Sequence, residues 1–294
     1  MNMENYKDFR FQKERDFSDL FTDIFVFLKN NYKRLFYLLL LYAGPFFLID
    51  GIVSAYFQNY VYSFSTMNPY SIHEMYGGPF AFLSKFLVWY GAIMLFKVLG
   101  YTFISSITYA YISLYAQKGP QFDINEVRPL AFSYFFPFLL ASILISIVIV
   151  IGTIFCIIPG IYLGICLSFI FIIMIWERKG IGEAFGRCFN VAHKDFWWTL
   201  LILLVISVAI GIVAFIIALP MTAISFFGVF TRMSSGDVNS YYFIINVIVS
   251  SITNVVVSLL SSVTMVAIAL QYFNIVEKEK KSQPDQSPSQ TVNL

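Results

Sequence analysis

The lysine and arginine residues of this chain gather in four short stretches, which alternate with long runs that carry almost no charge. Sixteen of the nineteen cations lie in these stretches, which are residues 1–34, 116–130, 177–195 and 277–294. Cationic loops are retained on the cytoplasmic side of a membrane. The pattern therefore predicts a polytopic membrane protein with both termini in the cytoplasm.

Composition supports this class and argues against others. Hydrophobic residues make up 59% of the chain and charged residues 12%, against roughly 45–50% and 25% in soluble domains. The basic residues form no dense run, so no nucleic-acid partner is predicted. The three cysteines are an odd number and two of them lie in apolar segments, which argues against a disulfide framework.

The uncharged runs are long enough for six membrane-spanning helices. One such helix needs about 20 predominantly apolar residues. The predicted fold is all-α, a six-helix integral membrane domain over residues 1–278, followed by a disordered cytoplasmic tail over 279–294 that is rich in Ser, Gln and Pro. The predicted spans are residues 35–57, 82–115, 131–155, 160–176, 196–219 and 243–273.

The third and fourth spans are separated by a predicted hinge. Residues 129–176 contain no charged side chain, and Ile158-Pro159-Gly160 is the one sequence within them that combines Pro and Gly. Proline removes a backbone donor and glycine permits a turn. We expect a tight outer turn at which Gly160 adopts a positive φ. The predicted outer loops, residues 58–81, 156–160 and 228–242, together carry one cation, Arg232.

Two stretches have apolar residues at helical spacing and precede the first and fifth spans. They cover about residues 16–31 and 181–193. We interpret both as amphipathic helices in the inner membrane interface, although each could instead be a cytoplasmic extension of its span. The aromatic residues that we expect to be buried in them are Phe21, Phe25, Phe185 and Phe189.

From Gly119 to Leu200 the sequence resembles the membrane domain associated with glycerophosphodiester phosphodiesterases and related bacterial membrane proteins. The hinge and the downstream Glu carry the resemblance most specifically, and the family usually has Ser where this chain has Cys188. The resemblance implies a six-helix membrane bundle. In multidomain relatives a catalytic barrel follows the bundle, whereas about 20 residues follow the last span here, so the phosphodiesterase activity is not expected. The matching residues are Ile158, Pro159, Gly160, Ile161, Tyr162, Leu163, Glu177, Ala184, Arg187, Phe189, Lys194, Phe196 and Trp197.

Two charged residues inside the predicted spans are candidates for a binding site. Lys97 lies in the second span, and Asp50 is the one acidic residue within a span. A charge in the bilayer is normally paired or functional. The first interpretation is a structural ion pair; a substrate or proton pathway that also includes Asn254 of the last span is the second. Snorkelling of Lys97 towards the interface, or a tilted span, is the third.

Glu177, Glu183, His193 and Asp195 are close together in one cytoplasmic stretch. Residues of these types supply metal sites and acid–base catalysis. They match no known ligand spacing, so we expect a solvated loop with no metal, no cofactor and no catalytic site.

Two functional classes remain open at this point. The first is a non-enzymatic membrane protein that binds lipid or organises a membrane complex, with a membrane-protein partner or a second copy of the chain. The second is a small-molecule transporter or permease with a site at Lys97. The resemblance implies residence in the bacterial cytoplasmic membrane.

Overall fold

The structure is a computed structural model that describes residues 9–66, 79–235 and 240–282. Throughout these ranges the secondary structure is helical, with no strand, so the predicted all-α class is confirmed. The elements are α1 (Phe17–Tyr42), α2 (Gly44–Thr66), α4 (Pro79–Lys118), η2 (Ile124–Glu126), α5 (Val127–Phe155), α6 (Ile157–Leu167), α7 (Ile170–Trp176), α8 (Ile181–Lys194), α9 (Phe196–Ser235), α10 (Ser240–Leu259) and α11 (Ser261–Ser282).

Five of the helical segments are long and apolar enough to cross a membrane, and α1 with α2 makes a sixth if this bent pair counts as one span. Their positions follow the six predicted spans in order. Both α4 and α9 contain 40 residues. At 1.5 Å per residue each is about 60 Å long, twice the roughly 30 Å of a bilayer core.

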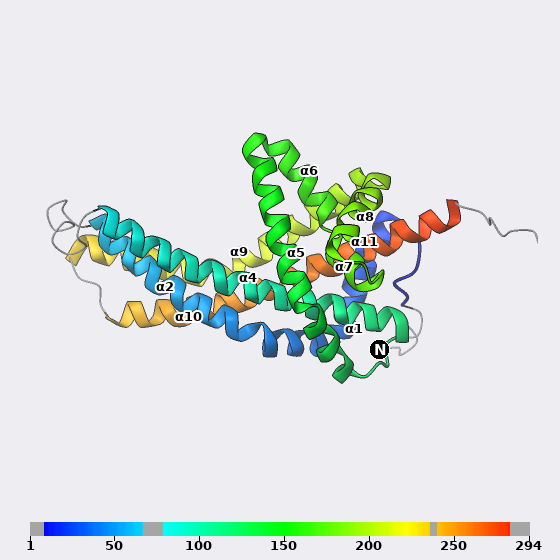
Figure 1. Cartoon of the computed structure of the whole chain (residues 1–294). Coiled ribbons are helices and arrows are strands. Elements are labelled where there is room, and N and C mark those ends of the chain that lie inside the picture. The colour runs from blue at the N-terminus through cyan, green and yellow to red at the C-terminus, as the bar shows by residue number, and fades with distance from the viewer. Residues whose placement is uncertain (1–8, 67–78, 236–239, 283–294) are drawn as a thin grey trace, which may run out of the picture.

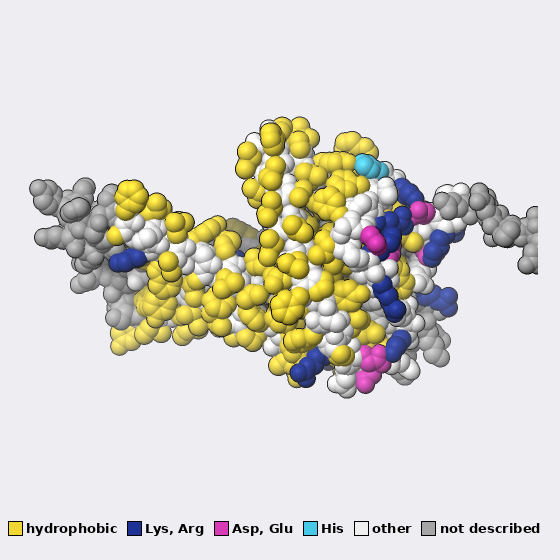
Figure 2. All heavy atoms as spheres, in the orientation of Figure 1, with side chains coloured by type: hydrophobic (Ala, Val, Ile, Leu, Met, Phe, Trp, Pro, Cys, Tyr) yellow, Lys and Arg dark blue, Asp and Glu magenta, His cyan; other side chains and the backbone are white. Residues whose placement is uncertain are grey.

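The helices form three parts (Figure 1). A long leg contains α2, α4, α9 and α10, in which α2 packs against both α4 and α10. An arm formed by α5 and α6 diverges from this leg. The remaining part, the polar end, contains α7, α8, the start of α1 and the end of α11. Apolar side chains cover the leg and the arm, whereas most of the visible charges gather at the polar end (Figure 2).

The first amphipathic stretch does not form a separate helix. It continues into the first span as α1, because neither Gly nor Pro interrupts residues 17–42. The break comes instead at Ala43, where α1 and α2 meet at 55°. Pro45 explains this position, since its ring would clash with the carbonyl one turn earlier in a continuous helix.

The buried face of α1 is rotated from the predicted one. Leu20, Ile24 and Phe27 are buried. Phe25 is 65% exposed, so the prediction that it is buried was wrong. Phe21 is half-buried, as are Phe185 and Phe189 of α8. The sequence alone did not show which face of α1 is turned towards the protein core. Apolar side chains lie both on the buried side of this helix and on its exposed side.

The hinge between α5 and α6 is tighter than predicted. Only Cys156 leaves the helical conformation, and both Pro159 and Gly160 lie in the first turn of α6. The described glycine with a positive φ is Gly119, so the predicted positive φ of Gly160 was wrong. Glycine is needed there for a different reason: a Cβ on Gly160 would lie 2.2 Å from Oγ1 and 3.0 Å from Cα of Thr153.

Several helices end at other residues than the predicted spans. Helix α9 continues through Pro220 into the predicted outer loop, which a membrane helix tolerates when neighbouring groups satisfy the freed carbonyl. The last span divides at Leu260 into α10 and α11. Helix α11 continues to Ser282, so the predicted tail began too early, and residues 283–294 lie outside the described residues. His73, in the predicted outer loop of residues 58–81, also lies outside the described residues, and the side chain of Arg232 is not described.

Replacing Gly160 by Ala should destabilise the arm, because the new methyl group would overlap Thr153. Overpacking of this kind costs about 1–3 kcal/mol. The matched control is Gly164→Ala, whose Cβ would meet its nearest neighbour, Cδ1 of Ile149, at 3.9 Å. Thermal unfolding of the detergent-solubilised protein measures both. Equal melting temperatures for the two variants would contradict the close packing of α5 against α6.

Candidate functional site

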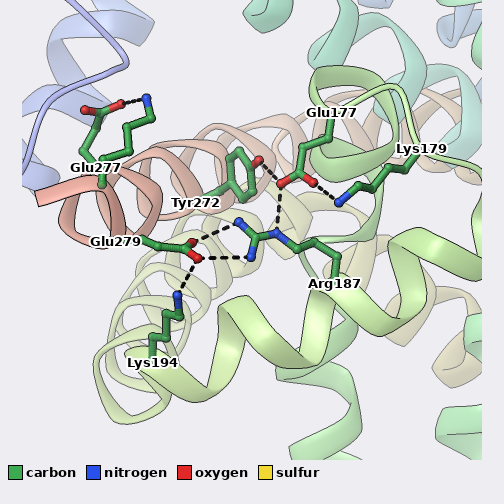
Figure 3. Close-up of polar contacts among 8 residues, drawn as sticks. Glu177, Lys179, Arg187, Lys194, Tyr272, Glu277 and Glu279 are labelled. Carbon is green, nitrogen blue, oxygen red and sulfur yellow. Dashed lines mark hydrogen bonds and ion pairs between the residues drawn. The ribbon is translucent and has the colours of Figure 1, made fainter. Parts of the chain in front are cut away.

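The polar end is held together by a network of ion pairs around Arg187 (Figure 3). Arg187, on α8, donates from Nε to Glu177 at 3.1 Å and from Nη2 to Glu279 at 3.0 Å. Glu177 caps the end of α7, and Glu279 belongs to α11. One guanidinium therefore joins the consecutive helices α7 and α8 to α11, which is far from both in the sequence.

Further donors complete the network (Figure 3). The hydroxyl of Tyr272 donates to Glu177 at 2.7 Å, and Lys179 forms an ion pair with the same carboxylate at 2.6 Å. Lys194 lies 2.7 Å from the carboxylate of Glu279. The carboxylates of Glu177 and Glu279 thus accept hydrogen bonds or ion pairs from four side chains. These contacts hold the helices of the polar end together.

This environment changes the acidity of the groups involved. Burial opposes ionisation of Glu177, but the hydrogen bonds from Lys179, Tyr272 and Arg187 together outweigh burial and lower its pKa. Hydrogen bonding to Glu279 raises the pKa of Arg187. Burial raises the pKa of Cys188, on the same helix, to about 12, so its thiol is a poor nucleophile. Glu177 is therefore held as an anion and is poorly suited to take up a proton as a general base.

A second polar layer lies beside this network and joins the N-terminal segment to α11 and α9. Arg15 is buried; its side chain donates to Asp23 at 2.7 Å and to the carbonyl of Phe11 at 2.7 Å. Its backbone N–H donates to Asn274 at 2.9 Å. The side-chain amide of Asn274 donates a hydrogen bond to the carbonyl oxygen of the Gln271 side chain at 3.2 Å. The amide of Gln271 in turn donates to the hydroxyl of Thr199 at 3.2 Å.

We did not identify this layer from the sequence. Its signal there is weak: Gln271 and Asn274 are polar residues three positions apart in an apolar run, a spacing that places both on one helix face.

An amphipathic pocket of about 450 Å³ opens next to the second layer, between the start of α1, the start of α9 and α11. Asp16, Ser18 and Lys278 are among its polar lining residues, and Phe17, Trp198 and Ile202 supply an apolar side. The rings of Phe17 and Trp198 lie 5.8 Å apart, and Trp198 is 50% exposed. Tryptophan is favoured where one end of a side chain meets lipid and the other meets water. We call this the α1–α9–α11 pocket.

The candidate binding residues of the spans lie in the leg. Asp50 on α2 is fully buried, and neither carboxylate oxygen has a hydrogen-bond partner. Lys97 on α4 and Asn254 on α10 are half-buried. Asp50 and Lys97 form no ion pair in the described part of the chain, so the first interpretation of these residues is not realised in this structure.

Helices α2 and α10, which carry Asp50 and Asn254, pack closely beside Asp50. A Cβ on Gly51 would lie 2.3 Å from Cα of Ser251, and the hydroxyl of Ser250 donates to the carbonyl of Gly51 at 3.2 Å. Glycine therefore brings α10 against α2 directly beside Asp50, which leaves little room to hydrate its carboxylate.

The residues on which the resemblance rests fall into two separate places. Glu177 and Arg187 meet in the network, whereas Pro159 and Gly160 lie at the far end of the arm. Tyr162 hydrogen-bonds His193. No group of three or more His, Cys, Asp and Glu side chains suited to a metal ion occurs among the residues that the structure describes.

Comparison of the chain with family models, with curated proteins and with solved structures finds no match. The membrane-domain resemblance therefore stays a prediction, and the function has to be argued from the geometry.

Replacing Glu177 by Gln should weaken the polar end by about 1–3 kcal/mol, since it removes the charge that pairs with Arg187 and Lys179. Because the folded-state pKa of Glu177 is depressed, its stabilisation is present above the ordinary value of 4.5 and is lost as pH falls through the lower folded-state value. The variant should therefore show a smaller loss of melting temperature on acidification than the unmodified protein. Glu183→Gln, an exposed change on α8, is the control, and identical pH profiles for Glu177→Gln and the unmodified protein would contradict this role.

Proposed function

We propose that this chain is a non-enzymatic integral membrane module that binds phospholipid at its cytoplasmic end. The observation that carries the proposal is the α1–α9–α11 pocket, which combines charged residues with an apolar side. A phospholipid has the same division, and 450 Å³ is within the size range of small-molecule sites. Its headgroup would contact Lys278 and Ser18, and its acyl chain would follow Trp198 and Ile202.

The proposed topology has six spans and both termini in the cytoplasm. The polar end would face the cytoplasm, because the cationic stretches of the sequence meet there (Figure 2). In this orientation α8 and the first turns of α1 would lie in the inner interface. Burial of Ala184, Cys188 and Val191 along one face of α8 supports an amphipathic role for that helix.

The acidities of Glu177 and Cys188 argue against acid–base catalysis by these two residues. Acid–base catalysis needs a group whose pKa lies near the working pH. The pKa of Glu177 is lowered and that of Cys188 is raised, both away from neutrality. The contacts of Glu177, Arg187 and Glu279 instead serve to fix α7, α8 and α11 beside the proposed lipid site. The bacterial cytoplasmic membrane is the proposed location, with a partner protein or a second copy as an assembly partner.

Filling the pocket tests the proposal. Ser18→Trp places a large side chain in the α1–α9–α11 pocket and should lower phospholipid affinity about tenfold, equal to about 1.4 kcal/mol. Thr22→Trp, one turn further along the same helix and outside the pocket lining, is the matched control. Native mass spectrometry of the protein released from mild detergent counts the retained lipids. Equal lipid retention by Ser18→Trp and Thr22→Trp would contradict the proposal.

Transport of a small molecule is the second candidate function, and the unpartnered Asp50 favours it. An isolated charge in an apolar interior is costly, and it is retained where a cation, a proton or a moving side chain compensates it. Lys97 is half-buried on the neighbouring helix and could move towards Asp50 during a transport cycle.

Replacing Asp50 by Asn separates the two functions. The change removes a buried charge that has no partner, so we expect the melting temperature to stay the same or to rise. A transport role predicts that solute flux into reconstituted vesicles is lost in Asp50→Asn and Lys97→Met, and that it persists in Asp19→Asn, an exposed change on α1. Lipid binding alone predicts retained phospholipid in all three variants and no flux in the unmodified protein.

A further inference from the structure

Arg178 has a backbone conformation that glycine usually occupies. It directly follows the capping residue of α7 and has φ 54°, the one positive φ of a non-glycine residue in the described ranges. Helices often end this way, with Gly at that position, because a Cβ is strained there. Gly119, which directly follows α4, has φ 79°. An arginine in this conformation after α7 points to a use for its side chain.

The Arg178 side chain lines a pocket of about 370 Å³, which we call the Arg178 pocket. It lies between the end of α4, the start of α5 and the end of α7, and it is separate from the α1–α9–α11 pocket. Arg178 makes no ion pair or hydrogen bond within the described part of the chain, whereas Arg187 pairs with Glu177 and Glu279. Its guanidinium donors are therefore available to a ligand.

Other donors line the same pocket. Ser113 is 1% exposed; its hydroxyl oxygen accepts from Gln117 at 3.1 Å, and no acceptor for its own proton occurs among the residues described. Gln117, which has a second amide hydrogen, and Tyr134 also line the pocket. A buried hydroxyl that lacks an acceptor is the kind of group that a bound oxyanion would satisfy.

The charge balance of the pocket favours an anion. Glu126 is its one acidic lining residue, and Lys118 forms an ion pair with that carboxylate. Arg178 is left as the uncompensated charge. Leu114, Leu130 and Ile175 supply apolar lining, so the pocket also accommodates a chain attached to the anion.

We propose that the Arg178 pocket binds a phosphate group, held by the guanidinium of Arg178 and the hydroxyl of Ser113. Arginine is suited to this role, because its planar fork of donors matches two phosphate oxygens at once. The phosphate could belong to a phospholipid headgroup or to a soluble ion. The lipid source rests on the proposed function, whereas the phosphate site itself does not.

The test uses the full-length protein and Arg178→Gly, which removes the guanidinium and relieves the backbone strain. Because Gly suits a positive φ, the variant should fold and melt no lower than the unmodified protein. Its affinity for phosphatidylglycerol in nanodiscs should fall about tenfold or more, as expected for loss of a charge-assisted hydrogen bond. Lys29→Gly is unsuitable as a control because it would weaken α1, so Lys29→Gln serves as the surface-charge control.

Three further measurements make the outcome decisive. Arg178→Lys should retain part of the affinity, and Glu126→Gln should raise it. Inorganic phosphate that competes at equal affinity would support the phosphate site and assign a soluble ligand. Unchanged binding of both phosphatidylglycerol and inorganic phosphate by Arg178→Gly would overturn the inference. If Ser18→Trp still lowered lipid retention in that case, the proposed lipid-binding function would stand without it.

Discussion

The cost of placing an unpaired charge in hydrocarbon organises this molecule. Most of its cations lie near the polar end, where Arg187 joins Glu177 and Glu279 and so ties α7, α8 and α11 into one unit. The leg and the arm present apolar side chains outward (Figure 2). Asp50 and Lys97 are exceptions, since both lie in the leg and form no ion pair within the described residues. Asp50 is the more deeply buried of the two, and neither of its carboxylate oxygens has a hydrogen-bond partner.

The class of the fold could be predicted from the sequence because charge and apolar length are local properties. The uncharged run of residues 129–176 predicted two spans, and the break at Cys156 lies within three residues of the predicted proline. Helix ends were harder to predict. The chain bends by 55° between α1 and α2, next to Pro45, whereas α9 continues through Pro220. The presence of a proline alone therefore does not predict where a helix ends.

The candidate site was only partly predictable, because its residues come from distant segments. Glu177 and Arg187 are ten positions apart, and the resemblance named both, yet nothing in the sequence indicated that Glu279 completes the pair. Arg178 was counted only as one cation of a cytoplasmic stretch. Its significance comes from a backbone angle and from the side chains of α4 and α5, which a linear pattern does not contain.

An electron cryo-microscopy structure of the protein in phospholipid nanodiscs tests the central claim most directly. We predict that the polar end lies at one membrane surface. We also predict that a phospholipid occupies the α1–α9–α11 pocket, with its headgroup against Lys278 and its acyl chain along Ile202. A pocket that lies clear of the bilayer, or one filled only by water beside fully ordered lining residues, would contradict it.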